Sequence, residues 1–220
     1  MKRITAILVM VLALTMAVQA AEIGFSGDAT LVSTYVWRGK TQFEGAAMQG
    51  TAEFSYGALA VGYWISTMQG GVAVETDPYI GVSLPTGPIE SAIGATIYSY
   101  DFFERQEYTV YELFVSAGYG PVSASFYYTP KQNEVDGAYV VEDAVYWIEV
   151  GAGTTLLGAD LAATLGLGSY SAPASDENVT NLLLTAGKSV SDAVSVSWNW
   201  NIAISETLDN MFFMTASYGF

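Results

Sequence analysis

The 220-residue sequence contains no cysteine and no histidine. Without cysteine, no disulfide can hold the chain together, although small exported domains often depend on disulfides. Without histidine, neither a Ser-His-Asp nor a Cys-His catalytic arrangement is possible. We also find no Gly-x-Ser-x-Gly segment, phosphate-binding loop or metal-ligand cluster. A pair of carboxylates could in principle hydrolyse glycosides, but the scattered acids need no such role. We therefore expect a protein that is not an enzyme and that uses no cofactor or metal.

Charged residues are scarce, and basic residues are the scarcest. They make up 13% of the chain, while 51% is hydrophobic, and the 22 acids outnumber the seven bases. Soluble proteins carry about 25% charged residues. A nucleic-acid partner is excluded, because phosphate backbones require a basic surface. The low charge instead indicates a large apolar surface.

One long apolar run stands at the N-terminus. Lys2 and Arg3 precede an apolar stretch over residues 4–18, and Val18-Gln19-Ala20 follows. This order is typical of a secretory signal peptide. The run is too short for a membrane-spanning helix, which needs about 20 residues. We predict a signal peptide over residues 1–20, cleavage after Ala20, and a mature chain over 21–220.

From Phe25 onward, apolar and polar residues alternate with a period of two, as in strands with two different faces. In one example, Val196, Trp198 and Trp200 alternate with serine and asparagine. Twelve segments fit: residues 25–37, 47–57, 58–66, 74–84, 88–100, 108–118, 121–129, 144–155, 159–168, 179–189, 194–202 and 210–220.

The links between these segments alternate in length. Short links fall at 57–58, 85–87, 119–120, 156–158 and 190–192, and longer ones at 38–46, 67–73, 101–107, 130–143, 170–178 and 203–209. Outer-membrane barrels have an even number of strands, with short periplasmic turns and longer external loops. We predict an all-β fold: a transmembrane antiparallel up-and-down β-barrel of about 12 strands. No link looks long enough to form a substantial plug.

Aromatic residues near strand ends match the interface girdles of membrane barrels. The predicted girdle comprises Tyr35, Trp37, Tyr56, Tyr98, Tyr100, Tyr128, Trp200 and Tyr218. The sequence ends in Tyr218-Gly219-Phe220, with apolar residues at every second position before the terminal Phe220. This ending resembles the signal read by the barrel assembly machinery, which we expect as a partner together with outer-membrane lipids.

Three stretches carry a resemblance to a known family. They are residues 33–42 (STYVWRGKTQ), 75–81 (ETDPYIG) and 111–128 (YELFVSAGYGPVSASFYY). Together with the signal peptide and Phe220, they resemble the TorF family of outer-membrane porins over essentially the whole mature chain. The resemblance implies a location in the outer membrane of a Gram-negative bacterium and a channel role, with no catalytic residues.

If the apolar faces meet lipid, the opposite faces bring eight acids into the lumen. These predicted pore-lining residues are Asp28, Glu53, Glu75, Asp77, Glu90, Glu112, Glu149 and Asp160. Rings of carboxylates favour cations, and twelve strands leave only a narrow channel. We therefore predict a porin that passes small solutes and prefers cations.

Arg38 is the one base included among the pore-lining residues. It follows Trp37 at the end of the first predicted strand, whereas Lys40, Arg105 and Lys131 lie in links. Arg38 could pair with a lumen carboxylate at the channel mouth. It could equally anchor the barrel at the membrane interface beside Trp37.

Two further interpretations remain open. The acids could pair with lumen hydroxyls in a closed interior, giving a structural or adhesion barrel that acts through its surface loops, such as residues 101–105 and 139–141. A soluble periplasmic barrel that binds a small ligand is also possible. That third interpretation does not explain the alternating link lengths.

Overall fold

All regular elements that the structure describes are β-strands. The computed structural model describes residues 22–68, 73–100, 108–132, 141, 144–169 and 178–220, and the predicted signal peptide lies outside them. The strands are β1 (Ile23–Val32), β2 (Tyr35–Trp37), β3 (Lys40–Phe43), β4 (Ala47–Tyr56), β5 (Leu59–Met68), β6 (Ala73–Thr86), β7 (Ile89–Tyr100), β8 (Tyr108–Tyr119), β9 (Val122–Thr129), β10 (Val145–Leu156), β11 (Ala159–Ser169), β12 (Asn178–Ser189), β13 (Val194–Ala203) and β14 (Met211–Gly219). In these residues there is no helix long and apolar enough to cross a membrane.

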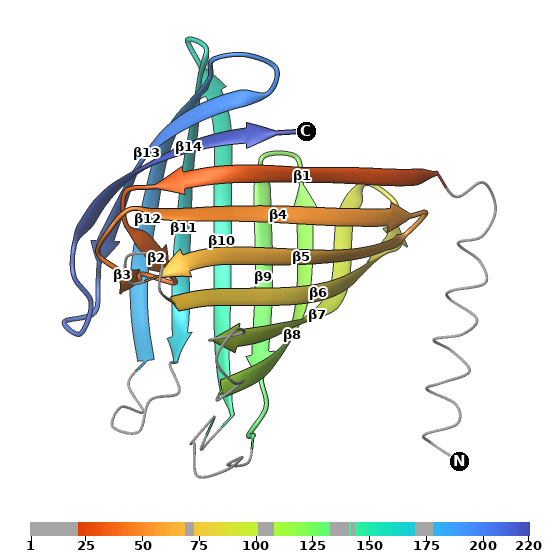
Figure 1. Cartoon of the computed structure of the whole chain (residues 1–220), viewed down its shortest axis with the longest axis horizontal. Helices are drawn as coiled ribbons and strands as arrows, with labels where there is room; N and C mark the ends of the chain where they lie inside the picture. Colours follow the sequence, from red (N-terminus) through yellow and green to blue (C-terminus); the bar gives the residue numbers. More distant parts are fainter. Residues whose placement is uncertain (1–21, 69–72, 101–107, 133–140, 142–143, 170–177) are drawn as a thin grey trace.

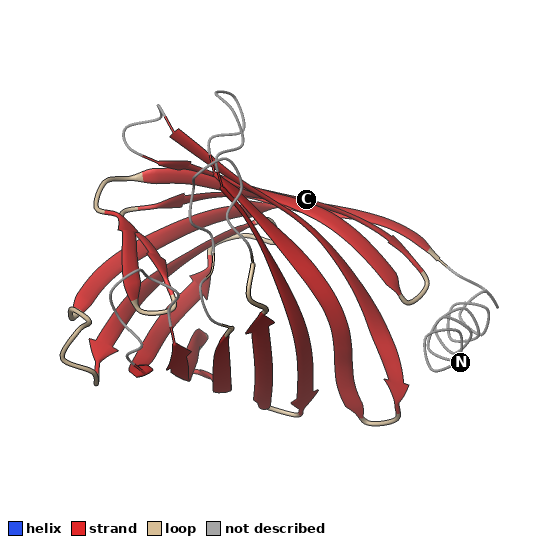
Figure 2. Ribbon diagram, turned by 90° about the horizontal axis from the view of Figure 1, so that it is seen from below, coloured by secondary structure: helices blue, strands red, loops and turns tan. Residues whose placement is uncertain are grey.

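Twelve of these strands form one closed antiparallel barrel. Successive strands from β4 to β14 pair with one another, and β1 closes the ring by pairing with both β4 and β14. Figure 1 shows these strands around the wall, and Figure 2 shows how strongly they tilt and twist. Closure gives every wall strand two hydrogen-bonding neighbours, so no edge is exposed. The predicted fold class, an antiparallel barrel of twelve strands, is confirmed.

The two faces of the wall differ in chemistry, as the period-two pattern predicts. Large apolar side chains point outward and are exposed. They include Phe25, Leu31, Met48, Phe54, Val61, Ile65, Ile80, Ile93, Leu113, Val115, Phe126, Val150, Leu165, Trp198, Phe212 and Met214. The inward face carries most of the buried polar groups, among them Glu75, Glu112, Asn181, Asn199 and Asn201. The barrel is thus apolar outside and polar inside, the reverse of a soluble domain.

Short links join the strands at one end of the barrel. Gly57, Gly87, Gly120 and Gly158 each occupy a short link and have positive φ angles. Glycine adopts this conformation without the steric cost that a Cβ would bring. Leu157 shares the positive-φ region, with φ 54°, and its side chain points freely into the surroundings.

The first predicted strand is wrong in its length. We expected it to span residues 25–37, but β1 ends at Val32. There the Ser33 hydroxyl accepts a hydrogen bond from the Met214 amide at 2.9 Å, and the chain leaves the wall. The next residues form the separate hairpin β2–β3. Period two cannot mark this boundary, because strands of a hairpin alternate just as wall strands do.

Phe220 closes the seam between β1 and β14. Its backbone exchanges two hydrogen bonds with Gly27, each of 3.0 Å, and its ring lies 6.2 Å from that of Phe25, centroid to centroid. Deleting Phe220 should lower the free energy of unfolding in detergent by about 1–3 kcal/mol, since two hydrogen bonds are lost. Denaturant titration of refolded protein measures this. Phe220→Ala keeps the backbone pairing and should cost less, so equal losses in both variants would contradict this assignment.

Candidate functional site: a hairpin folded into the lumen

The link between β1 and β4 contains a tight hairpin. β2 and β3 pair antiparallel, with Val36 opposite Thr41 and Trp37 opposite Lys40. Arg38 and Gly39 form the turn, with φ angles of 50° and 81°. Positive φ at both central residues is the signature of a type I′ turn, which suits the right-handed twist of a hairpin. The turn places Arg38 at the tip.

The base of the hairpin is anchored to the wall near β1. Val32, Tyr35 and Ala47 form a buried cluster, and Trp37, Phe43 and Trp64 pack against it. The rings of Tyr35 and Trp64 lie 5.7 Å apart, centroid to centroid. Aromatic pairs at this separation contribute about 0.5–1.5 kcal/mol beyond simple burial. This packing directs the hairpin inward instead of out into solvent.

The tip reaches the opposite side of the barrel. In the twelve-strand ring, β9 lies six positions from β1 in either direction, and Arg38 contacts β8, β9 and β10 around it. The guanidinium donates two hydrogen bonds, of 2.7 and 2.8 Å, to the two carboxylate oxygens of Glu112 on β8. Tyr98 and Thr129 also donate to Glu112, at 2.8 and 3.1 Å. The hairpin therefore spans the lumen and narrows it.

Arg38 is enclosed by aromatic rings as well as by the carboxylate of Glu112. Its guanidinium carbon lies 4.4 Å from the Trp37 ring centroid, 4.5 Å from that of Tyr127 and 5.6 Å from that of Trp147. Only 8% of its side chain is exposed, and 3% of that of Glu112. Burial lowers the pKa of Arg38, but the hydrogen bond and charge of Glu112 outweigh it, so the net pKa is raised. Arg38 and Glu112 form a buried, doubly hydrogen-bonded pair that holds the hairpin tip, which we call the Arg38 latch.

A second contact holds the tip on β12 and β13. The Asn201 amide donates to the Gly39 carbonyl at 3.4 Å, and the Asn181 amide donates to Asn201 at 2.6 Å. A Cβ at Gly39 would lie 2.9 Å from the Asn181 Cβ, so only glycine fits both the turn and this close approach. The tip is thus hydrogen-bonded to two separate parts of the wall, to β8 through Arg38 and to β13 through Gly39.

The strand register places all eight predicted acids on the inward face. One cross-strand row makes this plain, because it runs through directly paired residues: Ser26, Glu53, Gly62, Tyr79, Thr96 and Glu112. Glu75 and Asp77 are buried on β6, on the same inward face as Tyr79. That these acids line a conducting path remains a prediction.

Not all of the acids gather at the hairpin. Glu149 accepts a hydrogen bond from the Trp147 indole at 2.9 Å and lines a small cavity with Arg38. Glu53 accepts a hydrogen bond from Tyr79. The remaining three lie elsewhere: Asp28 accepts from Thr30, Asp160 accepts from Thr155, and Glu90 lines a separate cavity next to a short link.

The structure decides three expectations about the hairpin region. We expected no link long enough for a substantial plug; the inserted segment is a short hairpin over residues 35–43, and it crosses the lumen. Tyr35 and Trp37 belong to the hairpin and not to an interface girdle. Tyr98 is also inward, where it donates to Glu112. Arg38 is no interface anchor; it pairs with the lumen carboxylate of Glu112, the first of the two alternatives for this residue. Arg105 and residues 101–105 and 139–140 lie outside the described residues.

Sequence reasoning missed several inward residues that complete the site. Asn181, Asn201, Trp64 and Trp147 were not singled out, although they contact the hairpin or its partners. One local signal was available: a glycine at the second position of a two-residue link, flanked by alternating residues, favours a hairpin turn at Arg38-Gly39.

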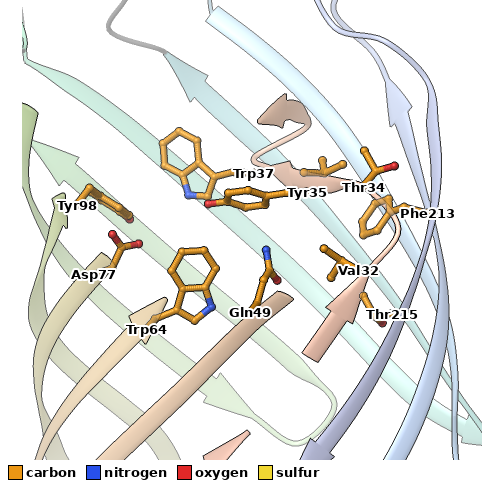
Figure 3. A pocket seen from close by; sticks show the side chains of 11 residues that line it. Val32, Thr34, Tyr35, Trp37, Gln49, Trp64, Asp77, Tyr98, Phe213 and Thr215 are labelled. Atoms are coloured by element: carbon orange, nitrogen blue, oxygen red, sulfur yellow. The ribbon is translucent and has the colours of Figure 1, made fainter. Parts of the chain in front are cut away.

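A cavity of about 330 Å³ lies beside the hairpin. Figure 3 shows its side chains, which come from the hairpin and from the walls on both sides. Its lining consists of Val32, Thr34, Tyr35, Val36, Trp37, Gln49, Trp64, Asp77, Tyr98, Phe213 and Thr215. Asp77 is the charged group among them.

Comparison with known proteins supports the fold. No protein-family model matches the chain, and neither does any curated protein. Among solved structures, the chain is similar to the COG4313 outer-membrane channel from Pseudomonas putida F1, with a TM-score of 0.51 and 13% identity over 91% of this chain and 96% of that one. It also matches Salmonella typhi OmpF in complex with daunomycin, with a TM-score of 0.48 and 10% identity over 91% of this chain and 98% of that one. At 13% identity, the likeness to the COG4313 channel shows the β-barrel fold.

Proposed function

We propose that this protein is a porin of the bacterial outer membrane that forms a narrow, cation-preferring channel for small solutes. The observation that carries the proposal is a closed barrel that is apolar outside, acidic inside and narrowed by an inward hairpin. The resemblance to the TorF family agrees with this role. Export by a signal peptide over residues 1–20, and insertion by the barrel assembly machinery through Phe220, belong to the same proposal.

The outer face supports a membrane location. Large exposed apolar side chains occur on eleven of the twelve wall strands, including Phe25 on β1 and Phe212 on β14; β12 is the exception. In water, such surface costs about 25 cal/mol for each Å² left exposed. In lipid this cost disappears, and the closed ring of hydrogen bonds satisfies the backbone where no water is present.

The balance of inward charge supports a preference for cations. Eight acids face inward, while the hairpin supplies Arg38 and Lys40. The positive charge of Arg38 is neutralised by Glu112, with which it forms a bidentate ion pair. The acids that remain set up a negative potential, and the low-dielectric wall concentrates it along the lumen.

The test is electrical. Refolded protein comprising residues 21–220 is inserted in a planar lipid bilayer. The reversal potential is then recorded under a KCl gradient of about tenfold. We expect small discrete conductance steps and a reversal potential of the sign set by cation flow. An anion-type sign would overturn the selectivity, and a complete absence of steps would favour the non-conducting structural barrel, in which the hairpin simply fills the lumen.

A further inference from the structure

The cavity beside the hairpin has an unusual combination of walls. Five aromatic side chains line it: Tyr35 and Trp37 from the hairpin, Trp64 from β5, Tyr98 from β7 and Phe213 from β14. Four of them form two packed pairs. The Tyr35 and Trp64 rings lie 5.7 Å apart, and Trp37 and Tyr98 meet edge to face at 5.8 Å. These pairs hold the rings in place around the space that Figure 3 shows.

One carboxylate belongs to the same cavity. Asp77 lies directly opposite Trp64 in the β5–β6 register and is only 5% exposed. Its Oδ1 atom is buried and accepts no hydrogen bond from the residues that the structure describes. In Figure 3 the Asp77 carboxylate lies between the Tyr98 and Trp64 side chains. A buried carboxylate oxygen in this state is costly unless a cation or a donor compensates it.

No basic side chain occurs among the lining residues of this cavity. The nearby basic residue Arg38, at the hairpin tip, donates hydrogen bonds from its guanidinium to both carboxylate oxygens of Glu112. The other polar lining groups are neutral: Thr34, Gln49 and Thr215. The electrostatic character of the cavity is therefore set by Asp77 and by the electron-rich faces of the rings.

We propose that this cavity binds a small organic cation of the quaternary-ammonium class. Aromatic faces attract such ions through the electrostatic quadrupole of the ring, most strongly when the contact is desolvated. A bare metal ion would need several oxygen ligands, and here Asp77 provides the only carboxylate of the lining. The volume of about 330 Å³ is at the lower end for small-molecule sites and suits a ligand of choline size. The inference rests on the proposed channel in one respect: the cation would reach the cavity through the lumen.

The test compares two ligands that differ mainly in charge. Refolded protein in detergent micelles is titrated with choline and with 3,3-dimethyl-1-butanol, its neutral isostere, and binding is followed by calorimetry and by tryptophan fluorescence. We expect saturable choline binding, and affinity for the isostere that is weaker by about tenfold or more. Equal affinities, or no saturable binding of choline, would overturn the proposal.

Variants then assign the binding to this cavity. Asp77→Asn removes the charge at constant shape, and Trp64→Leu removes one ring; each should weaken choline binding by about tenfold. Glu90→Gln is the matched control, because Glu90 is an inward acid that lines a different cavity, and it should bind choline like the parent. Unchanged binding in Asp77→Asn would place the ligand elsewhere and reject the assignment. If both cavity variants fail to fold, the comparison of the two ligands on the parent protein still decides.

Binding and conduction are separable outcomes. The titration is done in micelles and requires no ion flow. Choline binding without conductance steps would leave this inference standing and overturn the channel. Conductance steps without choline binding would do the opposite.

Discussion

Arg38→Met should release the hairpin tip and raise the single-channel conductance. The substitution keeps a long side chain against Trp37 and Tyr127 but leaves Glu112 buried without its cation. Breaking one side of a buried ion pair costs about 3–5 kcal/mol. If only 3 kcal/mol of that loss acts on the attachment of the tip, the ratio of released to attached hairpin rises by about 100-fold, since 1.4 kcal/mol is a factor of ten. The conductance of refolded protein in a planar bilayer measures the result.

Two companion variants make this prediction specific. Lys131→Met removes an exposed positive charge that lies after β9, outside the hairpin, and should leave the conductance unchanged. Arg38→Met combined with Glu112→Gln removes both charges, so the unfolding free energy should recover part of the loss seen in the single variant. A conductance in Arg38→Met equal to that of the parent, in protein shown to be folded, would mean that the hairpin does not narrow the ion path.

Neutralising three inward acids should abolish most of the cation preference. The variant Asp28→Asn/Glu53→Gln/Glu149→Gln removes charges that are neither part of the Arg38 latch nor fully buried. Each replacement keeps an oxygen that can still accept the hydrogen bond from Thr30, Tyr79 or Trp147, respectively. Because a ring of carboxylates sets the potential in the lumen, the permeability ratio of K⁺ to Cl⁻ should fall several-fold toward one. Reversal potentials under a KCl gradient give this ratio.

A matched triple variant controls for net charge. Glu22→Gln/Asp192→Asn/Glu206→Gln also removes three negative charges, but these residues lie in links or before β1 and are not inward wall positions. It should change the ratio much less, and the small change should vanish at high salt, where exposed charges are screened within about 3 Å at 1 M. Equal effects of the two triple variants would show that overall charge, and not the lining of the lumen, governs selectivity.

The outcome of the sequence analysis differs between the wall and the hairpin. The wall strands were predictable because the alternation that marks each of them is local. Outward residues such as Phe54 and inward ones such as Glu53 alternate within a single segment. The hairpin was not, because Tyr35 and Trp37 continue the same alternation as β1. What separates them is a bend after Val32, where Ser33 contacts Met214, a residue distant in sequence.

The sequence by itself determined the barrel, its twelve strands and the face on which each acid lies, because period two is a local property of the chain. Only the tertiary structure decided that Arg38 meets Glu112 and that Asp77 shares a cavity with five aromatic rings. These partners come from strands up to half a ring apart. Closure of the sheet brings them together across the lumen, and no spacing within any one segment encodes that distance.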